Sequence, residues 1–281
     1  MRNTRNRPLW ICIVALGILS SWPASAAGPL LPASIVSELP PRPSQEAFRE
    51  GERLEFSVTW TGIPVGVATM EVAGVLPMRS GTAYRVVSTA KSGSVLSVLY
   101  PVDDHFETYI DTEGLFSHRI VIDQHEGRRH RQKEIVFDQV NHKAYLYKQN
   151  KVKVYDVPPK VQDSLSSLYF FRTLGPFNVG KSVFIDVHES DKNWLLEIQV
   201  LGKERVDTPA GKFDTYKLKA LVRYDGLFVN KGDVMVWVTR DSRHIPVKMK
   251  SKIMIGSVNA SLTALRLGRK TSAPSAPISS E

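Results

Sequence analysis

Histidines are the side chains of this chain best suited to ligating a metal or moving a proton near neutral pH. They are His105, His118, His125, His130, His142, His188 and His244. None belongs to a recognised ligand motif, such as two histidines one helical turn apart. The closest groupings are Asp103-Asp104-His105 and His188-Glu189-Ser190-Asp191. Because adjacent residues of a strand point to opposite faces, these groupings indicate solvated strand ends, and we predict no metal site.

Acidic and hydroxyl side chains could instead provide acid–base or nucleophilic catalysis. The acidic candidates are Asp104, Glu107, Asp163 and Asp241, and the sequence does not show whether they meet in space. Asp163 has a structural explanation as a helix cap, which we favour. The serines Ser164, Ser166 and Ser167 lack the glycine-flanked elbow of an α/β-hydrolase. No catalytic motif is found, so we expect neither enzymatic activity nor a cofactor.

Arg172 follows an apolar segment and has two interpretations. Its guanidinium group either forms a structural ion pair or binds the carboxylate or phosphate of a ligand in a bidentate manner. If a ligand binds there, the residues that would line its site are Leu165, Leu168, Tyr169 and Trp60 together with Arg172.

The densest basic run is Arg128-Arg129-His130-Arg131-Gln132-Lys133, beside a predicted hairpin tip. One interpretation is a solvated strand with a charged outer face. The other is a contact with anionic envelope material, such as phospholipid headgroups or lipid A phosphates, through Arg128, Arg129, Arg131 and Lys133. Nucleic acid is not an expected partner despite the pI of 9.6, because the N-terminus, described below, has the pattern of a secretory signal peptide.

One helical segment, at about residues 161–174, must position several of these groups. Asp163 or Ser164 can cap its first turn, and Leu165, Leu168 and Tyr169 recur at helical spacing. Gly175-Pro176 ends the segment, because proline cannot continue a helix. It is the only convincing helix that we predict.

The segments on either side of this helix read as β-strands. Leu54, Phe56, Val58 and Trp60 alternate with polar residues, which is typical of a strand with one buried face. About a dozen such runs follow at short spacing, without long helices or an internal repeat. We therefore predict a mostly β fold, in which an antiparallel meander forms a curled sheet or open barrel. The central helix packs on it or in it, and the interior of such a barrel can hold a ligand.

The N-terminus has the pattern of a secretory signal peptide over residues 1–26. Arg2, Arg5 and Arg7 precede the apolar run Leu9 to Leu19, and Ala24-Ser25-Ala26 forms a cleavage site, with cutting after Ala26 or Ala27. The alternative is an uncleaved membrane anchor. Removing residues 1–26 takes away three arginines and no acid, so the net charge falls from +9 to +6.

Cys12, the sole cysteine, lies within this segment, so the exported product has no disulfide or cysteine-ligated metal. No later run is long and apolar enough to span a membrane. We predict a proline-rich tether at 27–47, a single β-rich domain at 48–267 and a disordered tail at 268–281.

Several segments together resemble a family of bacterial exported proteins, the domain of unknown function 3108. They are Phe48 to Leu54, Trp60 to Gly66, Val161 to Arg172, Thr208 to Phe213, Trp237 to Asp241, and Ile245 to Val247. The resemblance covers most of residues 48–265. It implies an exported, mostly β protein of Gram-negative type bacteria, and it implies no known activity.

Two functions are consistent with these observations. The first is a periplasmic binding protein that carries a lipid or other amphipathic envelope molecule in its β-barrel. The second is a structural or assembly factor of the cell envelope that acts through surface contacts, without a ligand cavity. The sequence does not determine the ligand or the oligomeric state.

Overall fold

The computed structural model describes residues 47–78, 81–224, 227–228, 234–253 and 256–269. The predicted signal peptide and nearly all of the predicted tether and tail lie outside the described residues. The described residues include no helix that is long and apolar enough to cross a membrane.

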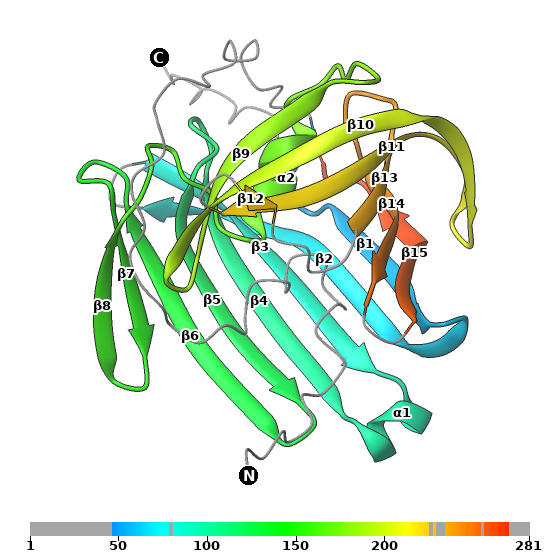
Figure 1. Ribbon diagram of the computed structural model, residues 1–281, viewed down its shortest axis with the longest axis horizontal. Helices are drawn as coiled ribbons and strands as arrows, with labels where there is room; N and C mark the ends of the chain where they lie inside the picture. Colours follow the sequence, from blue (N-terminus) through cyan, green and yellow to red (C-terminus); the bar gives the residue numbers. More distant parts are fainter. Residues whose placement is uncertain (1–46, 79–80, 225–226, 229–233, 254–255, 270–281) are drawn as a thin grey trace, which may run out of the picture.

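Within the described residues, fifteen antiparallel strands form one sheet, which confirms the predicted fold class (Figure 1). In the first half of the chain they are β1 Arg53–Trp60, β2 Ile63–Met78, β3 Gly81–Ser92, β4 Val102–Asp111, β5 Ser117–Glu126, β6 Arg129–Asp138, β7 Lys143–Lys148 and β8 Lys151–Asp156. In the second half they are β9 Ser182–Glu189, β10 Lys192–Thr208, β11 Gly211–Tyr224, β12 Leu227–Phe228, β13 Val234–Thr239, β14 Pro246–Lys252 and β15 Ser257–Arg266.

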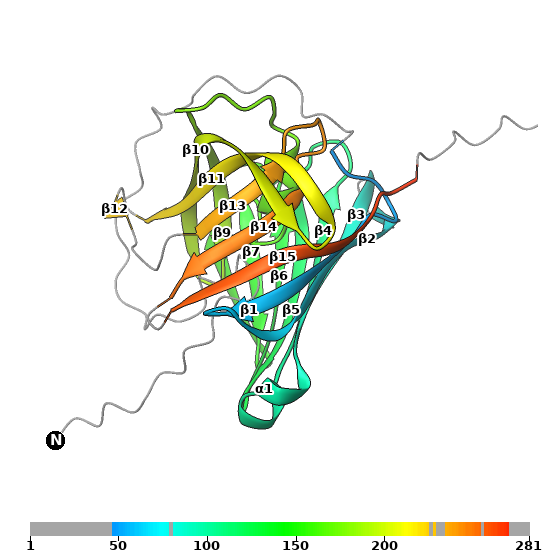
Figure 2. The ribbon, with the colours of Figure 1, turned by 90° about the vertical axis from the view of Figure 1, so that its right-hand side faces the viewer.

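The two edge strands of the sheet are consecutive in the sequence. The strand order is β8-β7-β6-β5-β4-β3-β2-β1-β15-β14-β13-β11-β10-β9, and β12 pairs with β11. The first and last strands therefore lie side by side within the sheet, while β8 and β9 form its edges. The segment from 157 to 181 connects these edges and carries helix α2, Ser166–Arg172. Figure 2 shows that the sheet curls around without closing.

Alternating side chains divide each strand between the concave inner face and the outer face of the sheet. On β4, Asp104, Phe106, Thr108 and Ile110 are buried, while the residues between them are exposed or half-buried. The same period of two runs along β1 and β3. Register shifts at Val58/Thr59, Val72/Gly74 and Val200/Gly202 are bulges, which bend strands and help the sheet to curl.

Helix α2 packs its side chains into two apolar clusters. Leu165 and Tyr169 join the main cluster inside the curled sheet, together with the inward residues of β1 to β7. Phe171 joins a second cluster with residues of β9, β10, β11 and β13, and its ring stacks on Phe177 at 4.4 Å between centroids. The predicted packing of a central helix against the sheet is confirmed.

The helices differ from the prediction in two respects. Helix α2 is shorter than the predicted 161–174, because Gln162 bridges to Val187 of β9 and the carbonyl of Val161 accepts a bond from the N–H of Ser117, so this part of the segment is extended. A second helix, α1 Ser94–Leu99, connects β3 to β4 and was not predicted. It has only six residues and precedes Pro101, so its sequence carries little helical periodicity.

A substitution at Gly66 would test how closely β2 packs against β3. A Cβ atom at this position would lie 2.2 Å from the backbone oxygen of Lys91, whereas one at Gly202 would meet nothing within 4 Å. We expect Gly66→Ala to lower the free energy of unfolding by about 1–3 kcal/mol, because the two strands must separate. Gly202→Ala should leave it nearly unchanged. Denaturant unfolding measures both, and equal effects would contradict the packing described.

Candidate functional site

Asp163 is the first of the buried groups that hold the segment before α2. Its side chain is fully buried, and its Oδ1 accepts bonds from the N–H groups of Leu165 at 2.7 Å and Ser166 at 2.8 Å. Its Oδ2 accepts bonds from the hydroxyls of Thr108 on β4 and Ser117 on β5. Burial raises the pKa of Asp163, although these four donors favour its charged form. The carboxylate supplies the predicted first-turn bonds, while Leu165 occupies the N-cap position.

Gln162 connects this segment to β9, one edge of the sheet. Its N–H donates to the carbonyl oxygen of Asp186 at 2.9 Å, and its own carbonyl accepts from the N–H of His188 at 2.8 Å. These bonds make an isolated parallel bridge to Val187. The Gln162 side-chain amide also donates to the carbonyl of Leu115, between β4 and β5, at 2.9 Å. Gln162 therefore covers part of an edge that would otherwise have unpaired backbone groups.

A buried ion pair joins β6 to the end of β9. The ammonium group of Lys133 contacts the carboxylate of Glu189 and donates to the hydroxyl of Ser190 at 2.6 Å. Only 11% of the Lys133 side chain and 4% of the Glu189 side chain are exposed. Burial opposes ionisation of Glu189, but Lys133 and the hydroxyls of Ser190 and Ser164 hold its pKa below the usual range.

Arg172 holds the C-terminal end of α2, as Asp163 holds its N-terminal end. We call these two buried residues the polar anchors of α2. Its Nη1 and Nη2 lie 2.7 and 2.9 Å from the two carboxylate oxygens of Glu52. The same guanidinium donates to the carbonyls of Ala47 at 2.7 Å and Arg243 at 3.0 Å. Its carbon lies 5.2 Å from the centroid of the Tyr169 ring. Arg172 is 1% exposed, so the structural ion pair describes it and the ligand-binding interpretation does not fit.

The other predicted ligand-binding residues differ in how deeply they are buried. Leu165 and Tyr169 are buried in the main apolar cluster, where they fill space between the helix and the sheet. Leu168 and Trp60 are only partly buried and pack against this cluster. Leu168 and Trp60 therefore remain candidates for ligand contact, whereas Leu165 and Tyr169 support the fold.

Polar residues occupy the concave face of β4 and β5 beyond the apolar rows. Asp104, Gln124 and Glu126 are 4%, 7% and 8% exposed. Gln124 is the register partner of Asp104 on β4 and of Arg131 on β6, while Glu126 is the partner of Arg129. We call these five residues the concave polar cluster. It brings two acids, two arginines and an amide to one face of three adjacent strands.

Asp104 is the most perturbed acid of the concave polar cluster. Burial, followed by the nearby charge of Glu126, raises its pKa to about 7. Bonds to Oδ1 from the N–H of His125 at 3.1 Å and to Oδ2 from the amide of Gln124 at 3.5 Å only partly offset these effects. Burial also raises the pKa of Glu126, against the opposing charges of Arg131 and Arg129. A buried acid that titrates near neutral pH often marks a functional site.

The strand alternation of β6 places three of the four cations that were predicted to contact anionic envelope material on the concave face. Ile135 and Phe137 are buried in the main cluster, so Arg129, Arg131 and Lys133, at the same parity, share their concave face. Arg128 is exposed in the turn before the strand. Lys133 is paired with Glu189 within the fold. A contact of these four cations with anionic envelope material stays a prediction.

Sequence reasoning named Asp104, Arg129 and Arg131 as candidates but missed their grouping with Gln124 and Glu126, although the period of two was available. Asp104 has the same parity as Phe106 and Ile110, and Gln124 and Glu126 have the parity of Ile120 and Ile122. Glu52, the partner of Arg172, lies 120 positions away in the sequence, and no local signal pairs them.

Comparison with family models identifies the class of protein. The model of a protein family of unknown function, DUF3108, matches residues 55–263, which is more than half of the chain. The chain belongs to this family, as the sequence resemblance indicated. No curated protein matches the chain.

Several solved structures are similar to this fold. A β-barrel-like protein of the domain of unknown function DUF1849 from Brucella abortus superposes with a TM-score of 0.53 at 10% identity, covering 79% of this chain and 99% of that one. A protein with a YmcC-like fold from Bacteroides fragilis has a TM-score of 0.34 at 12% identity, covering 78% and 97%. A hypothetical protein from Chlamydia trachomatis has a TM-score of 0.35 at 9% identity, covering 84% and 97%. The first similarity supports a curled, barrel-like sheet.

The ion pair between Arg172 and Glu52 provides a test of the C-terminal anchor. We expect Arg172→Met to lower the free energy of unfolding by about 3–5 kcal/mol, because it leaves the Glu52 charge buried without a partner. The double variant with Glu52→Met should be more stable than Arg172→Met alone. Lys91→Met, which breaks an exposed pair with Asp103, should cost less than about 1 kcal/mol. A similar loss of unfolding free energy in Arg172→Met and Lys91→Met would contradict the assignment of a buried structural ion pair.

Asp104 should make stability depend on pH. Its pKa is about 7 in the folded protein and about 4 in the unfolded chain, so the folded state binds more protons between these values. The free energy of unfolding should therefore fall as the pH rises from about 4 to 7, and Asp104→Asn should reduce this slope. Denaturant unfolding across that range measures the slope, and carbon NMR of the carboxyl group measures the pKa. A carboxyl midpoint near 4 would contradict the prediction.

Proposed function

We propose that this protein is an exported binding protein that carries an amphipathic envelope molecule, such as a lipid, against the concave face of its sheet. The observation that carries the proposal is the concave polar cluster of Asp104, Gln124, Glu126, Arg129 and Arg131. It lies on the inner face of the sheet, where a side chain that served folding alone would be apolar.

The polar cluster differs from the polar anchors of α2. Asp163 accepts four hydrogen bonds and Arg172 is fully paired, so these groups are satisfied by the fold. Asp104 has only two weaker bonds and a strongly raised pKa. Such a group is costly to bury and gains most from a ligand that supplies a hydrogen-bonding partner.

Apolar side chains adjoin the polar cluster along the same strands. Phe106 follows Asp104 on the concave face of β4, and Ile122 precedes Gln124 on β5. Leu168 and Phe170 of α2 are partly buried against the same apolar cluster. A molecule with a polar head and an apolar body matches this succession, with its head at Arg131 and Gln124 and its body toward the helix.

Export is part of the proposal and depends on the sequence. The signal-peptide pattern of residues 1–26 supports a periplasmic location, in which lipids and other amphipathic envelope molecules are available.

Native mass spectrometry of gently purified protein tests whether a small molecule is bound. We expect a discrete added mass that organic extraction removes, and we expect the extracted protein to bind a fluorescent fatty-acid probe. Arg131→Gln should weaken probe binding at least about tenfold, because it removes a charged hydrogen-bond donor from the concave face. Gln132→Ala, one residue away on the outer face, should leave binding unchanged.

Protein that carries no added mass and binds no probe would contradict the carrier proposal. Equal probe affinity in the Arg131→Gln and Gln132→Ala variants would contradict the placement of the ligand head. A specific envelope protein recovered by crosslinking to a ligand-free chain would instead favour a structural or assembly factor.

A further inference from the structure

The outer face of β4, β5 and β6 carries a second set of polar side chains, on the side of the sheet opposite to the concave polar cluster. Asp103 and His105 of β4 are the register partners of His125 and Asp123 of β5. His130 of β6 is the partner of His125 across the hairpin. Five side chains that can ligate a metal therefore lie next to one another on three strands.

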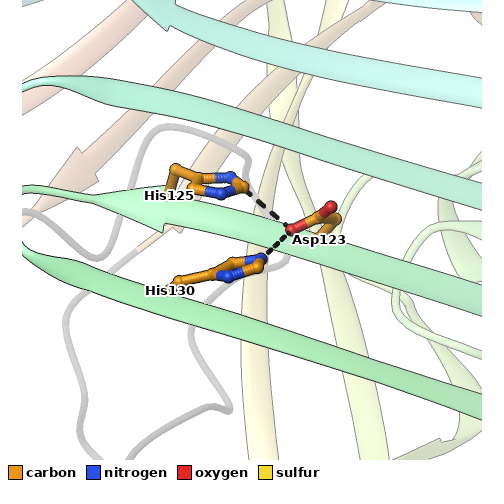
Figure 3. A group of neighbouring side chains, drawn as sticks. All are labelled: Asp123, His125 and His130. Atoms are coloured by element: carbon orange, nitrogen blue, oxygen red, sulfur yellow. Dashed lines mark hydrogen bonds and ion pairs between the residues drawn. The ribbon is translucent and has the colours of Figure 1, made fainter.

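Asp123, His125 and His130 converge within this set (Figure 3). The Nε2 atom of His130 lies 2.7 Å from Oδ1 of Asp123, and Nδ1 of His125 lies 3.5 Å from the same oxygen. One candidate ligand atom from each residue lies within 4.8 Å of the other two. The two imidazole rings stack at 3.9 Å between centroids.

We propose that Asp123, His125 and His130 bind a divalent transition-metal ion, with Zn²⁺ as the expected occupant. Two imidazoles and one carboxylate suit Zn²⁺ and Cu²⁺, whereas Mg²⁺ and Ca²⁺ prefer oxygen ligands alone. Three protein ligands leave a position for water or for a fourth side chain. His105 lies opposite Asp123 in the register.

The hairpin register places the backbones of the three residues next to one another before any ion binds. His125 and His130 flank the turn in which Gly127 has a φ of 61°, and the register places them directly opposite each other. Asp123 precedes His125 by two residues and so shares its face. Little conformational entropy is lost on binding when ligands project from paired strands, which favours affinity.

Neighbouring charges affect the strength of the site. His105 lies 3.7 Å from Glu107, and Asp103 pairs with Lys91 at 3.3 Å, so each has a competing contact. Arg128 is exposed in the hairpin turn and adds positive charge. The side chains of His125 and His130 are 52% and 54% exposed. This exposure favours reversible binding rather than a permanent structural ion.

The experiment uses the purified chain without an added histidine tag. Competition of Zn²⁺ between the protein and a chromophoric chelator should give one site per chain. His125→Asn, His130→Asn and Asp123→Asn should each weaken binding at least about tenfold, since even residues that only support metal ligands cost 10–100-fold when removed. His142→Asn is the matched control, because His142 is exposed on a turn away from the three ligands and should be neutral.

Cu²⁺ provides a second readout that does not depend on affinity. Electron paramagnetic resonance of the Cu²⁺-loaded chain should show nitrogen coupling from two imidazoles, reduced to one in His125→Asn. Unfolding curves check that each variant folds. The proposal is overturned if no ion binds at millimolar Zn²⁺, or if the His142→Asn variant loses as much affinity as the three ligand variants. Because this site and the concave polar cluster lie on opposite faces, its failure would leave the carrier proposal standing.

Discussion

The sheet does not close on itself, so its two edges must be held together by something other than strand pairing. The segment from Val161 to Arg172 does this with buried polar bonds. Gln162 pairs with β9, Asp163 bonds to β4 and β5, and Arg172 pairs with Glu52 ahead of β1. A buried charge without its partner is strongly destabilising, so these bonds specify one position of the helix. Apolar contacts of Tyr169 and Phe171 alone would allow more freedom.

This constraint explains why α2 is short and its surroundings are polar. Asp163 gives its four acceptor positions to two strands and to the first turn of the helix, so the residues before it must leave helical geometry. The ion pair of Lys133 and Glu189 adds a further connection, between β6 and β9. The curled sheet is therefore held at its two edges by the segment from Val161 to Arg172 and its buried polar bonds, which we call the seam.

The sequence predicted the features that depend on local periodicity and missed those that depend on register. Alternation in Leu54, Phe56 and Val58 was enough to predict strands, and helical spacing in Leu165, Leu168 and Tyr169 was enough to predict α2. The partner of Arg172 could not be predicted, because Glu52 is brought to it only by the whole fold.

The proposed metal-ligand residues and the concave polar cluster at the β5–β6 hairpin depend partly on local sequence and partly on strand register. The tight turn at Gly127-Arg128 opposes His125 to His130 and Gln124 to Arg131, so a hairpin register drawn from the sequence would have revealed both. The position of Asp104 beside Gln124 also depends on the pairing of β4 with β5. The register of this pairing includes a shift that cannot be predicted from the sequence. The sequence also did not show that Arg129, Arg131 and Lys133 of the basic run lie on the concave face, because this depends on which face of β6 the fold buries.

Native-state hydrogen exchange of individual amides tests the central claim most directly. The amide of His188 donates to Gln162 and that of Ser166 donates to Asp163, so both report on the seam. If the seam holds the fold together, these amides should exchange only through global unfolding, with free energies within about 1 kcal/mol of those in the middle of β4 and β5. Exchange of both amides through a local opening several kcal/mol lower in free energy, with the sheet still protected, would contradict the account.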